Sequence, residues 1–143
     1  MPFTRVRDLM TSKLVTLFAE QAMPLAEDIM KFRHIRHIPV IDPDSTLVGL
    51  VSHRDILAAN TSNLVGFTDD ERKARQSNIT VRDIMTKEVW TVSPQTFAEV
   101  AAQTLLDHRY GCLPVVEDGK LVGILTERDF LKIAIQHLRA NNA

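Results

Sequence analysis

Two segments of this chain, residues 47–55 and 121–129, share one order of apolar and polar positions. Each begins with a run rich in Val, Leu and Ile, continues with a hydroxyl residue and two polar residues, and reaches an aspartate. The apolar run predicts a buried strand. A hydroxyl residue followed three positions later by a carboxylate is typical of a capped helix N-terminus. Each segment is therefore predicted as a strand, a sharp turn and a helix.

The two predicted helix starts admit two interpretations. A helix N-terminus offers unpaired backbone N–H groups and a partial positive charge, which suit an anion such as phosphate. In the simpler interpretation, Ser52 with Asp55 and Thr126 with Asp129 only cap their helices. The capping pattern alone leaves both open.

The similarity of the two segments is part of an internal repeat. Residues 6–11, VRDLMT, return 75 positions later as VRDIMT at 81–86. The offset falls to 74 after the polar turn at 42–46, which is one residue longer than its counterpart at 117–120, a change that a hairpin loop tolerates. The predicted organisation is repeat 1 over residues 1–62, a polar connector over 63–78 and repeat 2 over 79–143.

Within each repeat the apolar spacing places the other elements. Residues 14–17 and 89–92 are predicted as short strands, and each precedes a helix with one apolar face. Those faces are Leu25, Ala26, Ile29 and Met30 in the first helix and Phe97, Val100, Ala101 and Leu105 in the second. Pro24 suits a first helical turn, and Thr96 with Glu99 is predicted as a capping box.

The second half of each repeat is predicted as a hairpin and a helix. Strands are expected at residues 37–41 and 47–51, with counterparts at 113–116 and 121–125, and the last helices begin near His53 and Glu127. Thr68 is expected to start one short exposed helix in the connector. The predicted fold is mixed α/β (α+β), β-α-β-β-α twice. Since neither repeat has helices enough to cover its sheet, the two repeats are expected to pack face to face about a pseudo-twofold axis.

Composition narrows the class of protein. The chain has 143 residues, 45% of them hydrophobic, and no apolar run near the roughly 20 residues that cross a bilayer. Its start lacks the apolar region of a signal peptide, and its formal charge of −1 gives no reason to expect nucleic acid or a membrane as partner. One cysteine excludes an internal disulfide. We therefore expect a cytoplasmic protein.

Four further patterns suggest chemistry but lack the residues that would complete it. His53-Arg54-Asp55 fits a kinase catalytic loop, yet the chain has no glycine-rich loop or D-F-G. His34 and His37 have no third metal ligand nearby, and the basic run at 31–37 is interrupted by apolar residues. Cys112 has no evident His–Asp relay and is interpreted as a buried thiol. No catalytic constellation and no metal site is predicted.

The repeat resembles a cystathionine-β-synthase-type (CBS) domain pair of the stand-alone bacterial type. The resemblance rests on the Arg-Asp-Leu/Ile-Met-Thr openings, the Ile38-Pro39-Val40 and Leu113-Pro114-Val115 strands, and the Gly-x-x-Ser/Thr-x-x-Asp segments. It implies two clefts between the repeats that bind an adenosine-containing ligand, such as AMP, ADP, ATP or an S-adenosyl compound. In the family the aspartate bonds the ribose hydroxyls and the Ser or Thr lies near the phosphate.

The resemblance assigns residues to both clefts. The first set, expected to be preferred by a charged nucleotide, is Thr11, Val15, Ile35, Arg36, His37, Ile124, Thr126, Arg128 and Asp129. The second set is Leu50, Ser52, Arg54, Asp55, Thr86, Trp90, Tyr110, Gly111 and Cys112. Arg36 can bind phosphate through its planar fork, whereas Gly111 stands at its counterpart position. Trp90 either stacks on a base or fills the core.

The predicted function is a regulatory module without catalysis of its own. It requires no cofactor, binds an adenine nucleotide as regulatory ligand, forms a homodimer and signals through that dimer or to a separate effector protein. The C-terminal helix, with Phe130, Leu131, Ala134, Ile135 and Leu138, is expected either in the dimer interface or packed within its own chain. The alternative function is a ligand-free structural dimerisation or adaptor protein, and an enzyme acting on a nucleotide is a more distant third.

Overall fold

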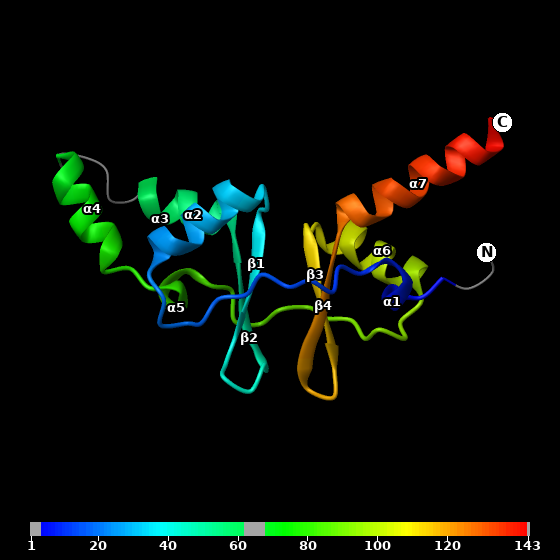
Figure 1. Cartoon of the computed structure of the whole chain (residues 1–143), viewed down its shortest axis with the longest axis horizontal. Helices are drawn as coiled ribbons and strands as arrows, with labels where there is room; N and C mark the ends of the chain where they lie inside the picture. The colour runs from blue at the N-terminus through cyan, green and yellow to red at the C-terminus, as the bar shows by residue number, and fades with distance from the viewer. Residues whose placement is uncertain (1–3, 62–67, 143) are drawn as a thin grey trace. The chain divides into compact units, whose positions relative to one another are not determined.

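The computed structural model describes residues 4–61 and 68–142, so residues 63–67 of the predicted connector lie outside the described part. Its elements in chain order (Figure 1) are α1 (Val6–Leu9), α2 (Met23–Arg33), β1 (His37–Ile41), β2 (Leu47–Ser52), α3 (His53–Thr61), α4 (Asp69–Ser77), α5 (Val81–Ile84), α6 (Ala98–His108), β3 (Cys112–Glu117), β4 (Lys120–Thr126) and α7 (Glu127–Asn141). They form two compact units. Unit 1 comprises Met1–Leu14 and Trp90–Ala143, and unit 2 comprises Val15–Val89.

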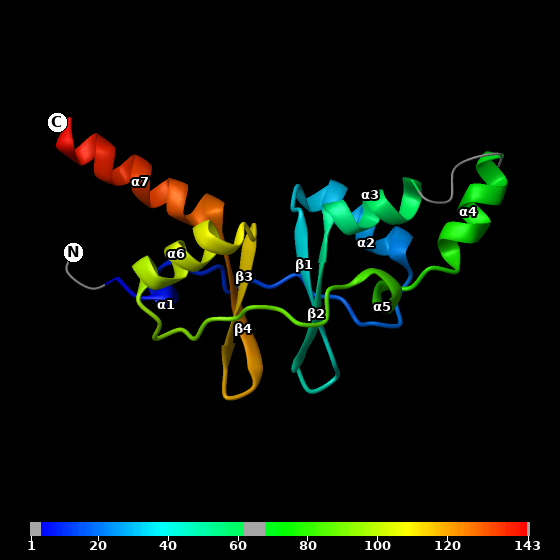
Figure 2. The ribbon, with the colours of Figure 1, turned by 180° about the vertical axis from the view of Figure 1, so that it is seen from behind.

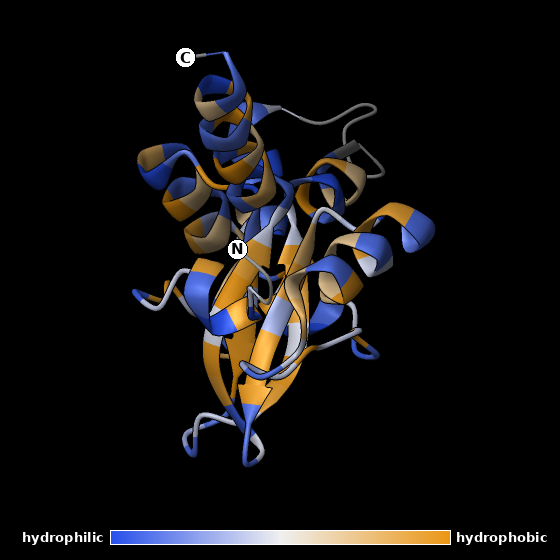
Figure 3. Ribbon diagram, turned by 90° about the vertical axis from the view of Figure 1, so that its right-hand side faces the viewer, coloured by the Kyte–Doolittle hydropathy of each residue, from blue (hydrophilic) through white to orange (hydrophobic). Residues whose placement is uncertain are grey.

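Each unit is built on one two-stranded hairpin, as the apolar runs and the polar turns between them predict. Strand β1 pairs antiparallel with β2, and β3 with β4, with a register shift after Val40 and after Val115. In unit 2, α2 and α3 lie beside the end of the hairpin opposite the turn, and α6 and the start of α7 do the same in unit 1 (Figures 1 and 2). The strands are largely hydrophobic and the hairpin turns hydrophilic (Figure 3). The mixed helix-and-strand fold of two repeats is confirmed.

The helix starts and ends follow local sequence signals. Pro24 lies in the first turn of α2, and α3 and α7 begin at His53 and Glu127, as predicted. Thr68 caps α4 and accepts a hydrogen bond from the Glu71 N–H at 3.2 Å. Helices α2 and α6 both end in a left-handed residue, His34 and Arg109 with φ of 55°, a conformation that commonly terminates a helix.

The short strands predicted at 14–17 and 89–92 are wrong. Each segment makes a single parallel bridge: the Leu17 N–H donates to the Pro39 carbonyl at 3.0 Å, and the Ile41 N–H donates to the Leu17 carbonyl at 2.9 Å. A ladder extended by two residues would next need an N–H from Pro39, which proline lacks. Val92 meets Pro114 in the same way, with its N–H donating at 3.1 Å. Each predicted strand is therefore reduced to one bridge.

The capping box predicted from Thr96 and Glu99 is also wrong. Helix α6 begins at Ala98, and its N-cap is Phe97. The Thr96 hydroxyl instead accepts a hydrogen bond from the Ser93 N–H at 3.1 Å, so it stabilises the preceding turn. The Ala98 N–H donates to the Thr4 carbonyl at 2.8 Å, so a strand-like contact supplies what the cap would have supplied.

The opening segment of each repeat packs in the unit that carries the other repeat's hairpin. Val81, which opens repeat 2, is fully buried in the core of unit 2 with residues such as Ile38 and Val51. Val6, which opens repeat 1, is fully buried in the core of unit 1 with residues such as Leu113 and Leu125. The compact units thus differ from the sequence repeats, because each unit contains the short opening helix of the other repeat. This helix is α5 in unit 2 and α1 in unit 1.

A methionine of each opening segment covers a hairpin glycine. A Cβ placed on Gly49 would lie 2.6 Å from the Met85 sulfur and 3.0 Å from the Thr86 carbonyl oxygen. A Cβ placed on Gly123 would lie 2.6 Å from the Met10 sulfur and 3.3 Å from the nearest backbone oxygen. Only glycine therefore permits the opening segment to approach the strand this closely.

We expect Gly49→Ala to lower the free energy of unfolding by about 1–3 kcal/mol, because the added methyl group must displace both the Met85 side chain and the Thr86 backbone. Gly123→Ala should cost less, since the side chain of Met10 can move and the backbone leaves more room. Urea denaturation measures both. Combining Gly123→Ala with Met10→Ala should be less destabilising than the sum of the two single changes. Wild-type stability of Gly49→Ala would contradict the close approach.

Candidate functional site

The start of α7 carries the Thr126–Asp129 pair of the first predicted set. The Thr126 N–H donates to Asp129 Oδ2 at 2.8 Å, and the Thr126 hydroxyl donates to the same oxygen at 3.4 Å. Both residues are partly buried. The carboxylate is therefore held at the end of strand β4, beside the unpaired N–H groups of a 15-residue helix.

The start of α3 repeats this geometry in unit 2. The Ser52 N–H and hydroxyl donate to Asp55 Oδ2 at 2.7 Å and 3.0 Å, and the Asp55 N–H donates to the Ser52 hydroxyl at 3.2 Å. In both pairs the aspartate accepts these hydrogen bonds through Oδ2 alone. The cap thus fixes each carboxylate while Oδ1 accepts no hydrogen bond from the described part of the chain.

Two aspartates at the short helices have the same local geometry but lie outside the predicted sets. Asp83 Oδ2 accepts the Thr80 N–H at 2.9 Å, and Asp8 Oδ2 accepts the Arg5 N–H at 2.8 Å. The hydrogen bond from the Thr80 backbone, followed by that from its side chain, lowers the pKa of the exposed Asp83 carboxyl. Capping by aspartate is thus a general device in this chain, and the cap alone does not identify a ligand site.

What distinguishes the Thr126–Asp129 and Ser52–Asp55 pairs is a neighbouring opening segment. Thr11 and Ile124 exchange two backbone hydrogen bonds, of 2.9 Å and 3.0 Å, on the strand that leads to Thr126. Thr86 and Leu50 exchange the equivalent bonds, of 2.9 Å and 3.0 Å, on the strand that leads to Ser52. Each unit therefore brings together predicted site residues that are far apart in the sequence and come from different repeats.

Each predicted set also includes four residues from the unit that does not carry its aspartate. Unit 2 carries Val15, Ile35, Arg36 and His37 of the first set, and unit 1 carries Trp90, Tyr110, Gly111 and Cys112 of the second. The Arg36 side chain is exposed, and its carbonyl accepts the His53 N–H at 2.8 Å, which ties the start of β1 to the start of α3. Val15 and Ile35 pack on the core of unit 2. Arg54 and Arg128 are exposed in the first turns of α3 and α7.

Three aromatic rings stack on unit 1, and sequence reasoning did not include the middle one. The His108 ring lies 4.6 Å from the Trp90 ring and 5.6 Å from the Tyr110 ring, with interplanar angles of 23° and 17°. Trp90 is 52% exposed, so the interpretation of this residue as core is wrong. Histidine at the end of a helix gives no sequence signal for stacking, because the contact depends on how the chain turns after α6.

Cys112 is buried in β3 beside Thr126, its partner across the strands. Burial, and to a smaller extent the negative charge of Asp129, raise the pKa of its thiol to about 12. A protonated, inaccessible thiol is a poor nucleophile, in keeping with a structural role. Within the described part of the chain no group of three or more His, Cys, Asp or Glu is placed to hold a metal ion.

A family model described as CBS domain matches residues 6–62 and 81–135, and the chain belongs to this family. The chain is similar to the AcuB protein of Vibrio cholerae, with 34% identity, a TM-score of 0.81 and coverage of 98% of this chain and 96% of that one. The structure of CBSX2 of Arabidopsis thaliana in complex with AMP is 33% identical, with a TM-score of 0.78 over 92% of this chain and 96% of that one. The CBS domain pair of MJ0100, in complex with 5′-methylthioadenosine and S-adenosyl-L-methionine, is 25% identical, with a TM-score of 0.78 over 95% of this chain and 99% of that one.

Several curated relatives are longer than this chain, which spans 47% of one and 64% of another. Among the helices in residues 4–61 and 68–142, none is both long enough and apolar enough to cross a membrane.

We expect the native Cys112 thiol to resist modification by a disulfide reagent at pH 8. Raising its pKa from 9.0 to about 12 makes the thiolate about a thousandfold scarcer, and burial further limits access. Following the absorbance of the released thiol in buffer and in 8 M urea measures the effect, and the unfolded chain serves as its own control. Equal rates in the two conditions would contradict the buried position.

Proposed function

We propose that the chain is a regulatory module that binds an adenosine-containing nucleotide, with its preferred site at the start of α7. The observation that supports this most is the placement of Thr11 against Ile124, on the strand that ends at the Thr126–Asp129 cap. A helix start, a fixed carboxylate and a segment from the other repeat then lie in one unit. That combination offers groups for a ribose and a phosphate.

Each polar group has a distinct role in this proposal. Oδ1 of Asp129 accepts hydrogen bonds from the ribose hydroxyls, while Oδ2 keeps the cap. The N–H groups of the first turn of α7, with Thr126, bind the phosphate. Arg36, His37, Val15 and Ile35 of unit 2 complete the first set on the strength of the family resemblance, with Arg36 supplying a planar, bidentate cation.

The known complexes of similar proteins support this ligand class. CBSX2 was solved with AMP, and the MJ0100 pair with 5′-methylthioadenosine and S-adenosyl-L-methionine. All three ligands contain adenosine. The second set, at Ser52 and Asp55, has the same cap but Gly111 in place of the Arg36 cation, so we assign the charged nucleotide to the first set. Trp90 offers a partly exposed ring for a base at the second.

In this proposal the chain performs no catalysis and uses no cofactor. Ligand occupancy shifts the balance between two conformations that bind the nucleotide unequally, and a dimer or a separate effector protein senses the change. The packing of the two repeats about a pseudo-twofold axis and a cytoplasmic location stay predictions.

We expect AMP, ADP or ATP at 100 times its dissociation constant to stabilise the protein by about 2.7 kcal/mol, which a thermal-shift measurement detects. Asp129→Ala should remove most of this stabilisation, because the ribose hydroxyls lose their acceptor. Arg36→Ala should weaken the binding of ATP more than the binding of AMP, because the proposed role of Arg36 is to bind phosphate. Isothermal titration calorimetry gives the affinities.

The matched control for Asp129→Ala is Asp83→Ala. It removes an aspartate of the same capping geometry that lies outside both sets. Trp90 is the only tryptophan of the sequence, so its fluorescence reports separately on the second set. Equal affinity of wild type, Asp129→Ala and Arg36→Ala would refute the assignment, and no binding by the wild type would favour the ligand-free adaptor.

The outer face of α7 supports the proposed homodimer. Phe130 packs on the core of unit 1, whereas Leu131, Ile135 and Leu138 are 62%, 46% and 59% exposed. Their spacing puts the three side chains on one face of the helix. An apolar stripe of this kind is stabilised when a second surface covers it.

We expect Leu131→Asp to shift the protein from dimer to monomer, because burying a charge opposes association while the lost leucine removes about 2 kcal/mol of apolar burial per subunit. Light scattering after size-exclusion chromatography measures the mass. Gln136→Asp, on another face of α7, should leave the mass unchanged. A monomeric wild type, or a dimer unaffected by Leu131→Asp, would show that this face is not the interface.

A further inference from the structure

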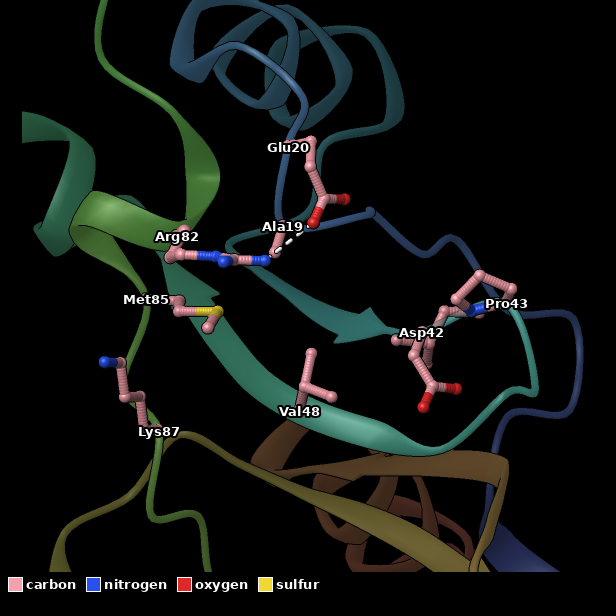
Figure 4. Close-up of a pocket in the computed structure, with 9 residues that line it drawn as sticks. Ala19, Glu20, Asp42, Pro43, Val48, Arg82, Met85 and Lys87 are labelled. Carbon is pink, nitrogen blue, oxygen red and sulfur yellow. Dashed lines mark hydrogen bonds and ion pairs between the residues drawn. The ribbon is translucent and has the colours of Figure 1, made fainter.

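Unit 2 contains a pocket of about 310 Å³ that involves none of the residues of the two predicted sets (Figure 4). Met85 and Val48 form part of its apolar lining, and four charged residues surround it: Glu20, Asp42, Arg82 and Lys87. Its volume is at the lower end of the range of small-molecule sites. The pocket lies between the opening segment of repeat 2 and the hairpin of repeat 1.

The charges of the pocket are balanced and only partly engaged. The Arg82 guanidinium forms an ion pair with Glu20 at 2.6 Å at one side of the pocket, and the two side chains are 59% and 75% exposed. Lys87 forms no ion pair with any residue that the structure describes. Asp42 Oδ1 accepts the Asp44 and Thr46 N–H groups, each at 2.9 Å, and this leaves Oδ2 for another donor.

The cations and Asp42 come from different elements. Arg82 belongs to α5 and Lys87 to the segment that follows it, whereas Asp42 lies at the hairpin turn. Met85 is seen between Arg82 and Lys87, and Val48 lies between these residues and Asp42 (Figure 4). A pocket with two positive and two negative side chains selects against a simple anion or cation. It suits a small molecule that carries both charges and has an apolar part.

The duplication provides an internal comparison. At the offset of 75, Glu20 corresponds to Gln95, Lys87 to Ser12 and Arg82 to Arg7. The Gln95 side chain donates a hydrogen bond to Glu117 at 3.2 Å, and the Gln95 carbonyl accepts one from the Arg5 guanidinium at 2.7 Å. The counterpart positions therefore lack the lysine and the paired glutamate, so these charges are not required to build the repeat.

We propose that this pocket binds a free α-amino acid with an apolar side chain. The carboxylate is bound by Lys87 and Arg82, the ammonium group by Asp42 and Glu20, and the side chain lies on Met85 and Val48. This site is separate from the nucleotide site and does not depend on the function proposed above.

The test is calorimetric titration of the full chain with L-leucine, L-methionine and L-valine. L-leucine serves as reference for two analogues, 4-methylpentanoate, which lacks the ammonium group, and 3-methylbutylamine, which lacks the carboxylate. Both analogues should bind at least about fivefold more weakly than L-leucine. This factor corresponds to the loss of one exposed charge pair whose contribution lies at the upper end of the usual range. Lys87→Ser and Glu20→Gln introduce the residues found at the counterpart positions, and each should weaken the binding of L-leucine by a similar factor.

Arg7→Ala changes the residue of unit 1 that corresponds to Arg82 of the pocket, and this variant should bind L-leucine as the wild type does. Absence of binding by all three amino acids overturns the proposal, as does equal binding by 4-methylpentanoate or by Lys87→Ser. Unchanged melting temperatures of the unliganded variants exclude misfolding as the cause. Asp129→Ala should retain L-leucine binding while losing nucleotide, so failure of either site is recognised independently of the other.

Discussion

The exchange of opening segments between the two repeats is the interaction on which the rest of this structure depends. Thr11 bonds to Ile124 and Thr86 bonds to Leu50 through pairs of backbone hydrogen bonds, on the outer edge of each hairpin. A two-stranded hairpin alone is marginal in water, since its edges and one face are uncovered. The exchanged segment occupies one edge and buries Val6 or Val81 in the core beneath it. Neither repeat as read from the sequence supplies this covering for itself.

Proline determines how far each hairpin extends on its other edge. Pro39 is paired with Leu50 and Pro114 with Ile124, the residues whose N–H and C=O groups bond to the exchanged segment. The N–H and C=O groups of Leu50 and Ile124 point away from the proline opposite them. Although proline lacks an N–H, it therefore leaves no hydrogen-bonding group of its strand partner unpaired. On the edge of the hairpin that faces away from the exchanged segment, Pro39 limits Leu17 to a single bridge and Pro114 limits Val92 to a single bridge. One residue type thus permits the hairpin while preventing a longer sheet.

Hydrophobic periodicity and capping motifs were sufficient to predict the hairpins and the helices α2, α3, α4, α6 and α7, because these depend on local spacing, and sequence similarity at a fixed offset revealed the duplication. It failed where a non-local partner decides the outcome. The apolar stretch at 14–17 resembles a strand, but its extent depends on Pro39, and Thr96 resembles a cap, but its hydroxyl is engaged by Ser93. The Trp90–His108–Tyr110 stack was missed for the same reason. The Thr126–Asp129 and Ser52–Asp55 pairs were found because a cap is a local motif.

The two copies keep the residues that build the units but differ at several charged positions. Positions that build the units are the same or nearly so: Val6 and Val81, Met10 and Met85, Gly49 and Gly123. Each has a role that geometry enforces, since the glycine must admit the methionine and the valine must fill the core. Some exposed charged positions are not restrained in this way: Arg36 corresponds to Gly111 in the alignment of the repeats, and Lys87 corresponds to Ser12. A duplicated scaffold with fixed packing and variable charge can hold different polar ligands in its two halves without any change in the fold, because exposed charges contribute little to stability and much to recognition.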